Sequence, residues 1–141
     1  MTESNFFLDT NVIIRFLAND HPELSQKART IIAAIETGSA AADISDTVIF
    51  ECIYVMAKQY KMPRNYMIDV LGSLLSLETV HAPTKSALLE ALGVWGRIQR
   101  LSFADALYLV WAQRSLHKRI ATFDKGMDNC LPNVTRVEQF P

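Results

Sequence analysis

Hydrophobic residues along the 141-residue chain fall into short continuous runs, separated by longer segments with helical spacing. The first run, Phe6-Phe7-Leu8, ends at the polar Asp9-Thr10-Asn11, a pattern typical of a buried strand that leads into a capped helix. The clearest helical segment closes at Gly38, and its apolar positions recur three or four residues apart: Leu24, Ala28, Ile31, Ile32 and Ile35.

Strand and helix patterns continue to alternate through the rest of the chain. The further strands expected are 41–45, 79–82, 118–124 and 134–137, and the helices expected are 12–17, 24–35, 48–60, 63–75, 85–97 and 101–111. Asp46 or Thr47 is expected to cap the third helix, and the last helix is apolar on nearly all sides. This alternation predicts an α/β fold with a parallel sheet covered on both faces, in one domain spanning residues 1–141.

The composition is that of a globular protein with almost no net charge. The 14 Lys and Arg residues stand against 15 Asp and Glu residues, and half of the chain is hydrophobic, which argues against disorder. A chain with this charge has no general basic coat for nucleic acid, so any such binding needs a local patch or bound cations.

Cysteine use and the N-terminus indicate a reduced protein without a membrane anchor. Cys52 and Cys130 form no CxxC or Cys/His cluster, which argues against structural zinc. Glu3 and Asp9 stand where a signal peptide would need positive charge and then a long apolar run. No stretch approaches the roughly 18 apolar residues of a membrane-spanning helix. We therefore expect a cytoplasmic protein with no membrane contact.

Four acidic residues stand among apolar neighbours, where an unpaired charge is costly: Asp9, Glu51, Asp105 and Asp124. Asp9 and Asp124 fall at the carboxyl ends of expected strands, whereas Glu51 and Asp105 lie near the start of expected helices. In a parallel sheet these positions share one edge, which is where open α/β sheets place their ligands. We therefore expect the four carboxylates to converge.

Converging carboxylates repel one another unless some are protonated or a cation lies among them. Ligand sets made of oxygen alone suit Mg²⁺ or Mn²⁺, and such ions activate water and stabilise phosphodiester displacement. The pattern therefore favours a divalent metal site.

Each acid also has a purely structural explanation. Ser102-Phe103-Ala104-Asp105 resembles a capping box, and Asp124 could be a turn residue. Asp9 could end a strand, and Glu51 could pair with a cation. The functional interpretation gains from the set, because four structural explanations would have to hold together.

The four acidic segments, taken in order, resemble the motifs of PIN-domain ribonucleases, specifically the VapC-type toxins of bacterial toxin–antitoxin pairs. The matching stretches are Phe7–Leu17, Ile44–Glu51, Leu101–Leu107 and Ala121–Lys125. The resemblance implies a three-layer α/β/α sandwich with a central, mostly parallel sheet. It also implies Mg²⁺- or Mn²⁺-dependent hydrolysis of RNA phosphodiester bonds, an endoribonuclease activity.

The resemblance further implies a role for each carboxylate. Asp9 and Asp105 would be the principal metal ligands, and Glu51 and Asp124 would complete the acidic site directly or through water. Three polar residues could hydrogen-bond the carboxylates or could simply cap helices and strand ends: Thr10, Asn11 and Thr122.

In the expected mechanism the metal holds a phosphate oxygen and lowers the pKa of a water, which Asp124 or Glu51 orients or deprotonates. Four basic residues near the motifs could contact phosphates or could be ordinary surface residues: Arg15, Arg97, Arg100 and Lys125.

By resemblance, we also expect an RNA substrate, a cognate antitoxin and a homodimer. A groove for an apolar antitoxin segment could be lined by five residues that could equally be core: Phe16, Leu17, Phe50, Ile53 and Tyr54. Trp95 and Trp111 stand in apolar stretches at helical spacing, which favours core packing over base stacking. The histidines match no motif, and Asp128 is interpreted as a loop residue.

Other classes of function fit the sequence less well. A phospho-acceptor signalling domain needs an aspartate at the end of its middle strand, and Thr79-Val80-His81-Ala82 has none. A phosphatase with an aspartyl nucleophile needs an acid two residues after Asp9, where Asn11 stands. A PIN-like domain that binds RNA or protein without cleaving remains the alternative, although retention of all four acids favours an enzyme.

Overall fold

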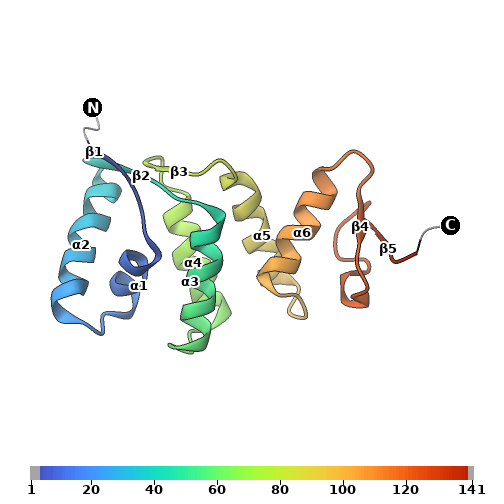
Figure 1. The fold of residues 1–141 in the computed structure, drawn as a ribbon, viewed down its shortest axis with the longest axis horizontal. Coiled ribbons are helices and arrows are strands. Elements are labelled where there is room, and N and C mark those ends of the chain that lie inside the picture. Colours follow the sequence, from blue (N-terminus) through green and yellow to red (C-terminus); the bar gives the residue numbers. More distant parts are fainter. Residues whose placement is uncertain (1–3, 140–141) are drawn as a thin grey trace. The chain divides into compact units, whose positions relative to one another are not determined.

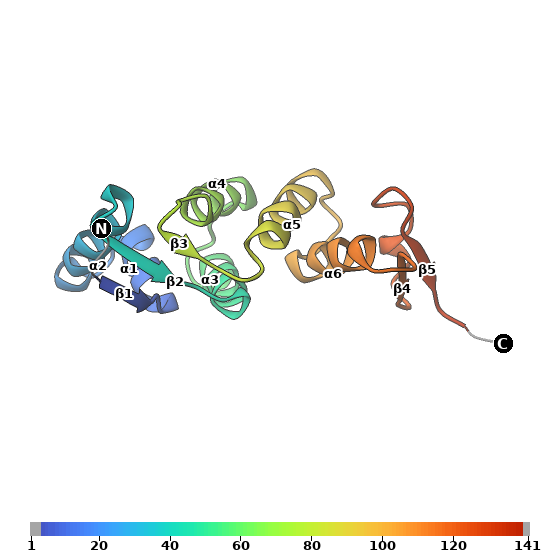
Figure 2. The same ribbon diagram turned by 90° about the horizontal axis from the view of Figure 1, so that it is seen from above.

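The computed structural model describes residues 4–139 of the chain. Its elements divide into two compact units, of which unit 1 ends at Lys85 and unit 2 begins at Ser86 (Figures 1 and 2). Within residues 4–139, no helix is both long enough and apolar enough to cross a membrane.

Unit 1 alternates strands with pairs of helices, as the hydrophobic pattern predicts. Its elements are β1 (Ser4–Phe7), α1 (Thr10–Ala18), α2 (Pro22–Thr37), β2 (Ala40–Asp43), α3 (Asp46–Lys58), α4 (Arg64–Leu75) and β3 (Val80–His81).

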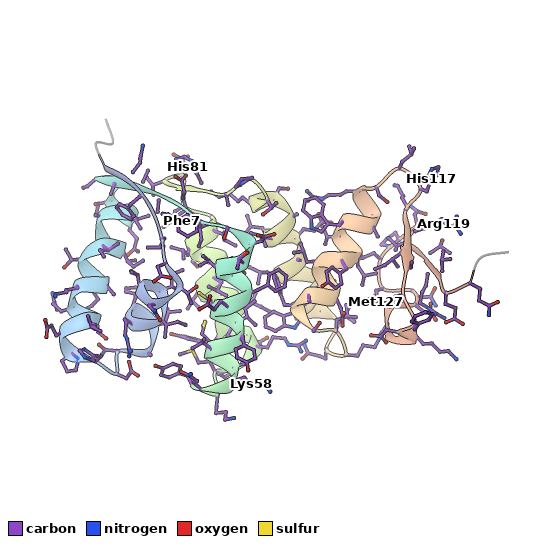
Figure 3. The ribbon with its side chains drawn as sticks, viewed as in Figure 1. Phe7, Lys58, His81, His117, Arg119 and Met127 are labelled. Carbon is purple, nitrogen blue, oxygen red and sulfur yellow. The ribbon has the colours of Figure 1, made fainter. Side chains whose placement is uncertain are left out.

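The three strands of unit 1 form a parallel sheet in the order β1-β2-β3. Phe7 is in register with Asp43, and Asp43 with His81, so the carboxyl ends of all three strands reach one edge. Figure 3 labels Phe7 and His81, the last residues of β1 and β3. Helices α1 to α4 are drawn below the strands of this sheet in Figure 1. Asp9 follows β1 directly and therefore begins α1 at this edge.

Local polar contacts set where the helices of unit 1 begin and end. Ser45 has an extended backbone and its hydroxyl accepts from the Val48 amide, so Ser45 is the cap of α3. The expectation of Asp46 or Thr47 as that cap was wrong, because both residues already lie within the helix. His21 caps α2 through Nδ1, which accepts from the Leu24 amide at 3.1 Å.

The core of unit 1 joins the sheet to the helices beneath it. Its largest side chains with almost no exposure are Leu8, Ile13, Ile35, Ile44, Ile49, Met56, Leu71 and Leu75. Leu8 extends the β1-β2 ladder, since its amide donates to the Asp43 carbonyl at 2.9 Å. Leu8, the residue before Asp9, is therefore fixed both by core packing and by a backbone hydrogen bond.

Unit 2 contains most of α5 and ends in a second, two-stranded sheet. Its elements are α5 (Lys85–Arg97), α6 (Phe103–Arg114), β4 (Arg119–Ala121), a 3₁₀ turn η1 (Lys125–Met127) and β5 (Thr135–Val137). Strands β4 and β5 pair in parallel, with Ile120 opposite Arg136. Trp95 of α5 packs edge-on against Phe103 of α6, with ring centroids 5.7 Å apart.

All expected helices and strands are present, and every strand pairing is parallel. The strands pair in two groups, one of three and one of two. Trp95 is 5% exposed, as expected of a core residue, whereas Trp111 is 43% exposed, so its assignment to the core was wrong. Helical spacing places both indoles in apolar stretches. Because α6 is apolar on nearly all sides, the spacing does not show which of its faces is buried, and Trp111 lies on an exposed one.

Two glycines in open surroundings should respond to alanine with opposite signs. Gly38 ends α2 at φ +85°, where no atom lies within 4 Å of an added Cβ, so Gly38→Ala should cost about 1 kcal/mol through backbone strain alone. Gly72 lies inside α4 with equal space, so Gly72→Ala should stabilise the protein by up to about 1 kcal/mol. Urea unfolding measures both changes, and equal signs would contradict this account.

Candidate metal and catalytic site

Asp9 stands at the junction between β1 and α1, at the carboxyl edge of the sheet in unit 1. Its backbone is extended and its carbonyl accepts from the Val12 amide, but its carboxylate makes no capping bond to the helix. The side chain is exposed. Asp9 thus occupies a capping position without using its carboxylate as a cap, which leaves both oxygens for another ligand.

Glu51 is the sixth residue of α3 and so lies in the second turn, slightly farther into the helix than the sequence suggested. It is exposed, while its neighbour Cys52 is completely buried. Burial raises the pKa of the Cys52 thiol to about 12, and the negative charges of Glu51 and Asp9 contribute to this rise. The charges of both carboxylates of unit 1 therefore contribute to the raised pKa of one buried thiol, that of Cys52.

Thr10 links these two segments of unit 1. Its side chain is 2% exposed and hydrogen-bonds Cys52. This contact ties the start of α1, which carries Asp9, to the turn of α3 that carries Glu51. Asn11, the next residue, is exposed.

Asp105 is the third residue of α6 and forms the expected capping box with Ser102. The Asp105 amide donates to the Ser102 hydroxyl at 3.1 Å, and the Ser102 amide donates to Asp105 Oδ2 at 3.3 Å. The structural explanation for Asp105 therefore holds. It does not use up the carboxylate, because these bonds leave Oδ1 for a second partner.

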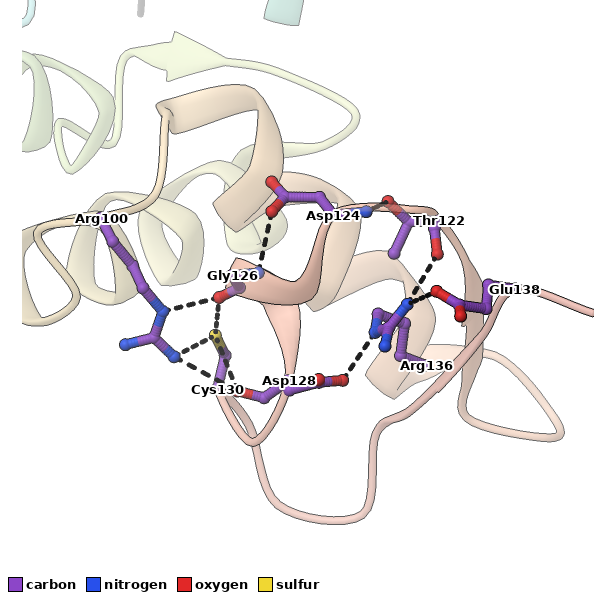
Figure 4. Close-up of polar contacts among 8 residues, drawn as sticks. All are labelled: Arg100, Thr122, Asp124, Gly126, Asp128, Cys130, Arg136 and Glu138. Atoms are coloured by element: carbon purple, nitrogen blue, oxygen red, sulfur yellow. Dashed lines mark hydrogen bonds and ion pairs between the residues drawn. The ribbon is translucent and has the colours of Figure 1, made fainter.

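Asp124 caps the 3₁₀ turn that follows β4. Its Oδ1 accepts from the Gly126 amide at 2.8 Å, and its own amide donates to the Thr122 hydroxyl at 3.1 Å (Figure 4). Thr122 therefore binds the backbone of Asp124 rather than its carboxylate. As at Asp105, one carboxylate oxygen, Oδ2, takes no part in the local bonds.

Asp105 and Asp124 line the same pocket in unit 2, a hollow of about 560 Å³ between α6 and β4. Tyr108, Trp111 and Arg119 also line it. The fold thus brings together two acids that lie 19 positions apart in the sequence. Asp9 and Glu51 belong to unit 1. Among residues 4–139, no three His, Cys, Asp or Glu side chains are grouped closely enough to hold a metal ion.

The carboxylates of unit 1 (Asp9 and Glu51) and those of unit 2 (Asp105 and Asp124) are the kind of donor that a hard divalent cation prefers. Each pair offers carboxylate oxygens only, and Mg²⁺ typically takes one or two carboxylates while keeping several waters. None of the salt bridges found among residues 4–139 uses Asp105 or Asp124, and the cationic Arg119 lines the same pocket as these two carboxylates.

The candidate phosphate contacts divide into two kinds. Arg15 pairs with Asp20 at 3.0 Å, and Arg100 binds backbone carbonyls of the 126–130 segment, so both have structural partners. Arg97 and Lys125 are exposed and make no side-chain hydrogen bond or ion pair within residues 4–139. Asp128 pairs with Arg136 at 2.7 Å, which agrees with a structural loop residue.

The two cysteines should react very differently with a thiol reagent. A pKa of about 12 leaves about one Cys52 in ten thousand ionised at pH 8, and the residue is buried, so only Cys130 should react rapidly in the folded protein. Ellman's reagent should therefore detect one fast thiol, and both after unfolding. Rapid labelling that persists in Cys130→Ser would show that the Asp9–Cys52–Glu51 region is open.

Comparison with known proteins agrees with the motifs. The model of the family described as "PIN domain" matches residues 6–130 and so runs through both units. The chain is also 26% identical over 121 residues to a "VapC ribonuclease" of Aquifex aeolicus (strain VF5), an alignment that covers 84% of this chain and 86% of that protein. The resemblance read from the motifs and the expected PIN-like α/β/α fold class are thereby confirmed. The chain belongs to the PIN domain family.

Proposed function

We propose that this chain is a metal-dependent endoribonuclease, the toxin of a VapBC-type toxin–antitoxin pair, acting in the cytoplasm. Membership of the PIN family and similarity to a protein named VapC ribonuclease support a nuclease. The observation that carries the proposal is the pocket lined by Asp105 and Asp124, in which each carboxylate keeps one oxygen outside its local hydrogen bonds.

In this proposal Asp9 and Asp105 are the principal ligands of Mg²⁺ or Mn²⁺, and Glu51 and Asp124 complete the acidic site. A bound divalent ion supplies positive charge beside the scissile phosphate and makes water more acidic. Asp124 is suited to accept the proton of the attacking water through Oδ2, since Oδ1 is already bonded to Gly126. The amide of Ser102 restricts rotation of the Asp105 carboxylate, and the amide of Gly126 restricts rotation of the Asp124 carboxylate.

The antitoxin and a second copy of the chain are the proposed protein partners. Unit 1 has an apolar pocket of about 270 Å³, lined in part by Phe16 and Leu17 of α1 and by Leu74 of α4. Phe50 and Ile53 are half-buried, and Tyr54 is 65% exposed. These exposures support an apolar antitoxin segment that docks on unit 1, with the homodimer as a separate contact.

Amide substitution of the acids tests the nuclease directly. Antitoxin-free protein should make discrete cuts in total cellular RNA with Mg²⁺ or Mn²⁺ and none with EDTA. The double variant Asp9→Asn, Asp105→Asn should lose at least about 100-fold in cleavage rate, because it removes the principal metal ligands. Asn at position 105 keeps the capping geometry, so the melting temperature should change little.

Glu78→Gln is the matched control, since Glu78 is an exposed acid outside the candidate site. It should cleave like the wild type. Cutting that survives in EDTA or in the double variant would refute the metal mechanism. A folded, antitoxin-free chain that cuts nothing would instead support the alternative, a PIN-like domain that binds RNA or protein without cleaving.

A further inference from the structure

Arg100 connects two segments of unit 2 that are far apart in the sequence. It lies between α5 and α6, and its side chain reaches the turn that follows β4 (Figure 4). Its Nε donates to the Gly126 carbonyl at 2.7 Å, and its Nη2 donates to the Asp128 carbonyl at 3.2 Å and to Cys130 Sγ at 3.3 Å. The planar guanidinium suits such a set of acceptors, because its donors are arranged in a rigid fork.

The turn that Arg100 binds is the one that carries Asp124. The Gly126 amide donates to Asp124 Oδ1, and the Gly126 carbonyl accepts from Arg100, so Gly126 joins the two side chains. The Cys130 thiol donates hydrogen bonds to the same two carbonyls. Its Sγ lies 3.3 Å from the Gly126 oxygen and 3.7 Å from the Asp128 oxygen. The carbonyl groups of this turn are thus gathered around one guanidinium.

A second arginine holds the turn from its other side. Arg136 of β5 pairs with the Asp128 carboxylate at 2.7 Å and donates to the Thr122 carbonyl at 3.3 Å. It also pairs with Glu138. The turn is therefore anchored to β5 by Arg136 and to the start of α6 by Arg100.

The other end of the Arg100 connection is equally well held. Leu101 is buried and its amide donates to the Ile98 carbonyl at 3.2 Å, while Ser102 caps α6 together with Asp105. Arg100 and Asp105 therefore lie on one short segment with little freedom. A contact from Arg100 to the Asp124 turn accordingly restrains the two acids that line the shared pocket.

We propose that Arg100 is a positioning residue, which sets the placement of Asp124 relative to Asp105 for a divalent cation. This inference rests on the proposed function. It assigns Arg100 a role different from direct phosphate contact, because three of its donor contacts already go to the protein. Groups that orient metal ligands typically change metal affinity or activity by roughly 10- to 100-fold when removed.

The two roles of Arg100 predict different kinetics in Arg100→Ala. Loss of positioning should weaken Mn²⁺ binding, measured by calorimetry, by about 10-fold, and should lower kcat by a similar factor with little change in KM for RNA. Hydrogen exchange of the Gly126 amide should also accelerate, since that amide bonds Asp124. Loss of a phosphate contact would instead raise KM and leave Mn²⁺ affinity and Gly126 exchange unchanged, and that result would overturn the proposal.

Arg100→Lys separates geometry from charge. Lysine keeps the positive charge but lacks the fork, so it should rescue a phosphate contact and should not restore positioning. Arg114→Ala is the matched control, because Arg114 is an exposed arginine of unit 2 that bonds Glu90 at 2.7 Å and Ser86 at 3.1 Å. It should leave Mn²⁺ affinity, kcat and Gly126 exchange unchanged. Full rescue by lysine would overturn the proposal.

Gly126→Ala provides a second variant in case Arg100→Ala fails to fold. A Cβ at this position would lie 3.0 Å from Asp124 Oδ1, so the carboxylate must shift while the Arg100 side chain is retained. Mn²⁺ affinity should again fall, and unchanged affinity would contradict the claim that this turn positions Asp124. If the wild type neither binds Mn²⁺ nor cleaves RNA, the proposed function fails. Exchange at Gly126 in Arg100→Lys still decides whether Arg100 holds the turn.

Discussion

The bond between a carboxylate and a backbone amide at the start of a helix or 3₁₀ turn is the interaction on which the two acids of unit 2, Asp105 and Asp124, depend. Acids placed near one another repel, and the amide groups that a helix leaves unpaired at its amino end offset this cost. Asp105 bonds the Ser102 amide, and Asp124 bonds the Gly126 amide. Both carboxylates are thereby oriented by the backbone before any cation binds.

This arrangement also explains why the structural and the functional interpretations of these acids do not exclude each other. An amide bond occupies one oxygen of a carboxylate, and a metal or a water can use the second. In unit 2, capping supplies the orientation that catalysis would require, and Arg100 and Arg136 secure the turn on which Asp124 stands. Stability and chemistry therefore draw on the same few hydrogen bonds.

Most of the secondary structure could be predicted from the sequence, because helix and strand periods are local properties. The helix that closes at Gly38 and the strand before Asp9 are examples. The cap at Ser45 was missed, because Ser, Asp and Thr stand side by side there and composition alone does not rank them. The exposure of Trp111 and the contact from Arg100 to Gly126 depend on tertiary packing, which no local pattern encodes. For the candidate site, the sequence singled out four acids as candidates, whereas the placement of Asp105 and Asp124 along one pocket needed the fold.

The absence of a capping bond at Asp9 has a consequence for relatives of this chain. An acid that also caps a helix is retained by selection for folding even after catalysis is lost. An acid that caps nothing has no such protection and is free to drift once the activity is no longer needed. We therefore expect a catalytically silent descendant to keep the equivalents of Asp105 and Asp124 longer than that of Asp9. Under the proposed function, the residue at position 9 is thus the more informative mark of a working nuclease.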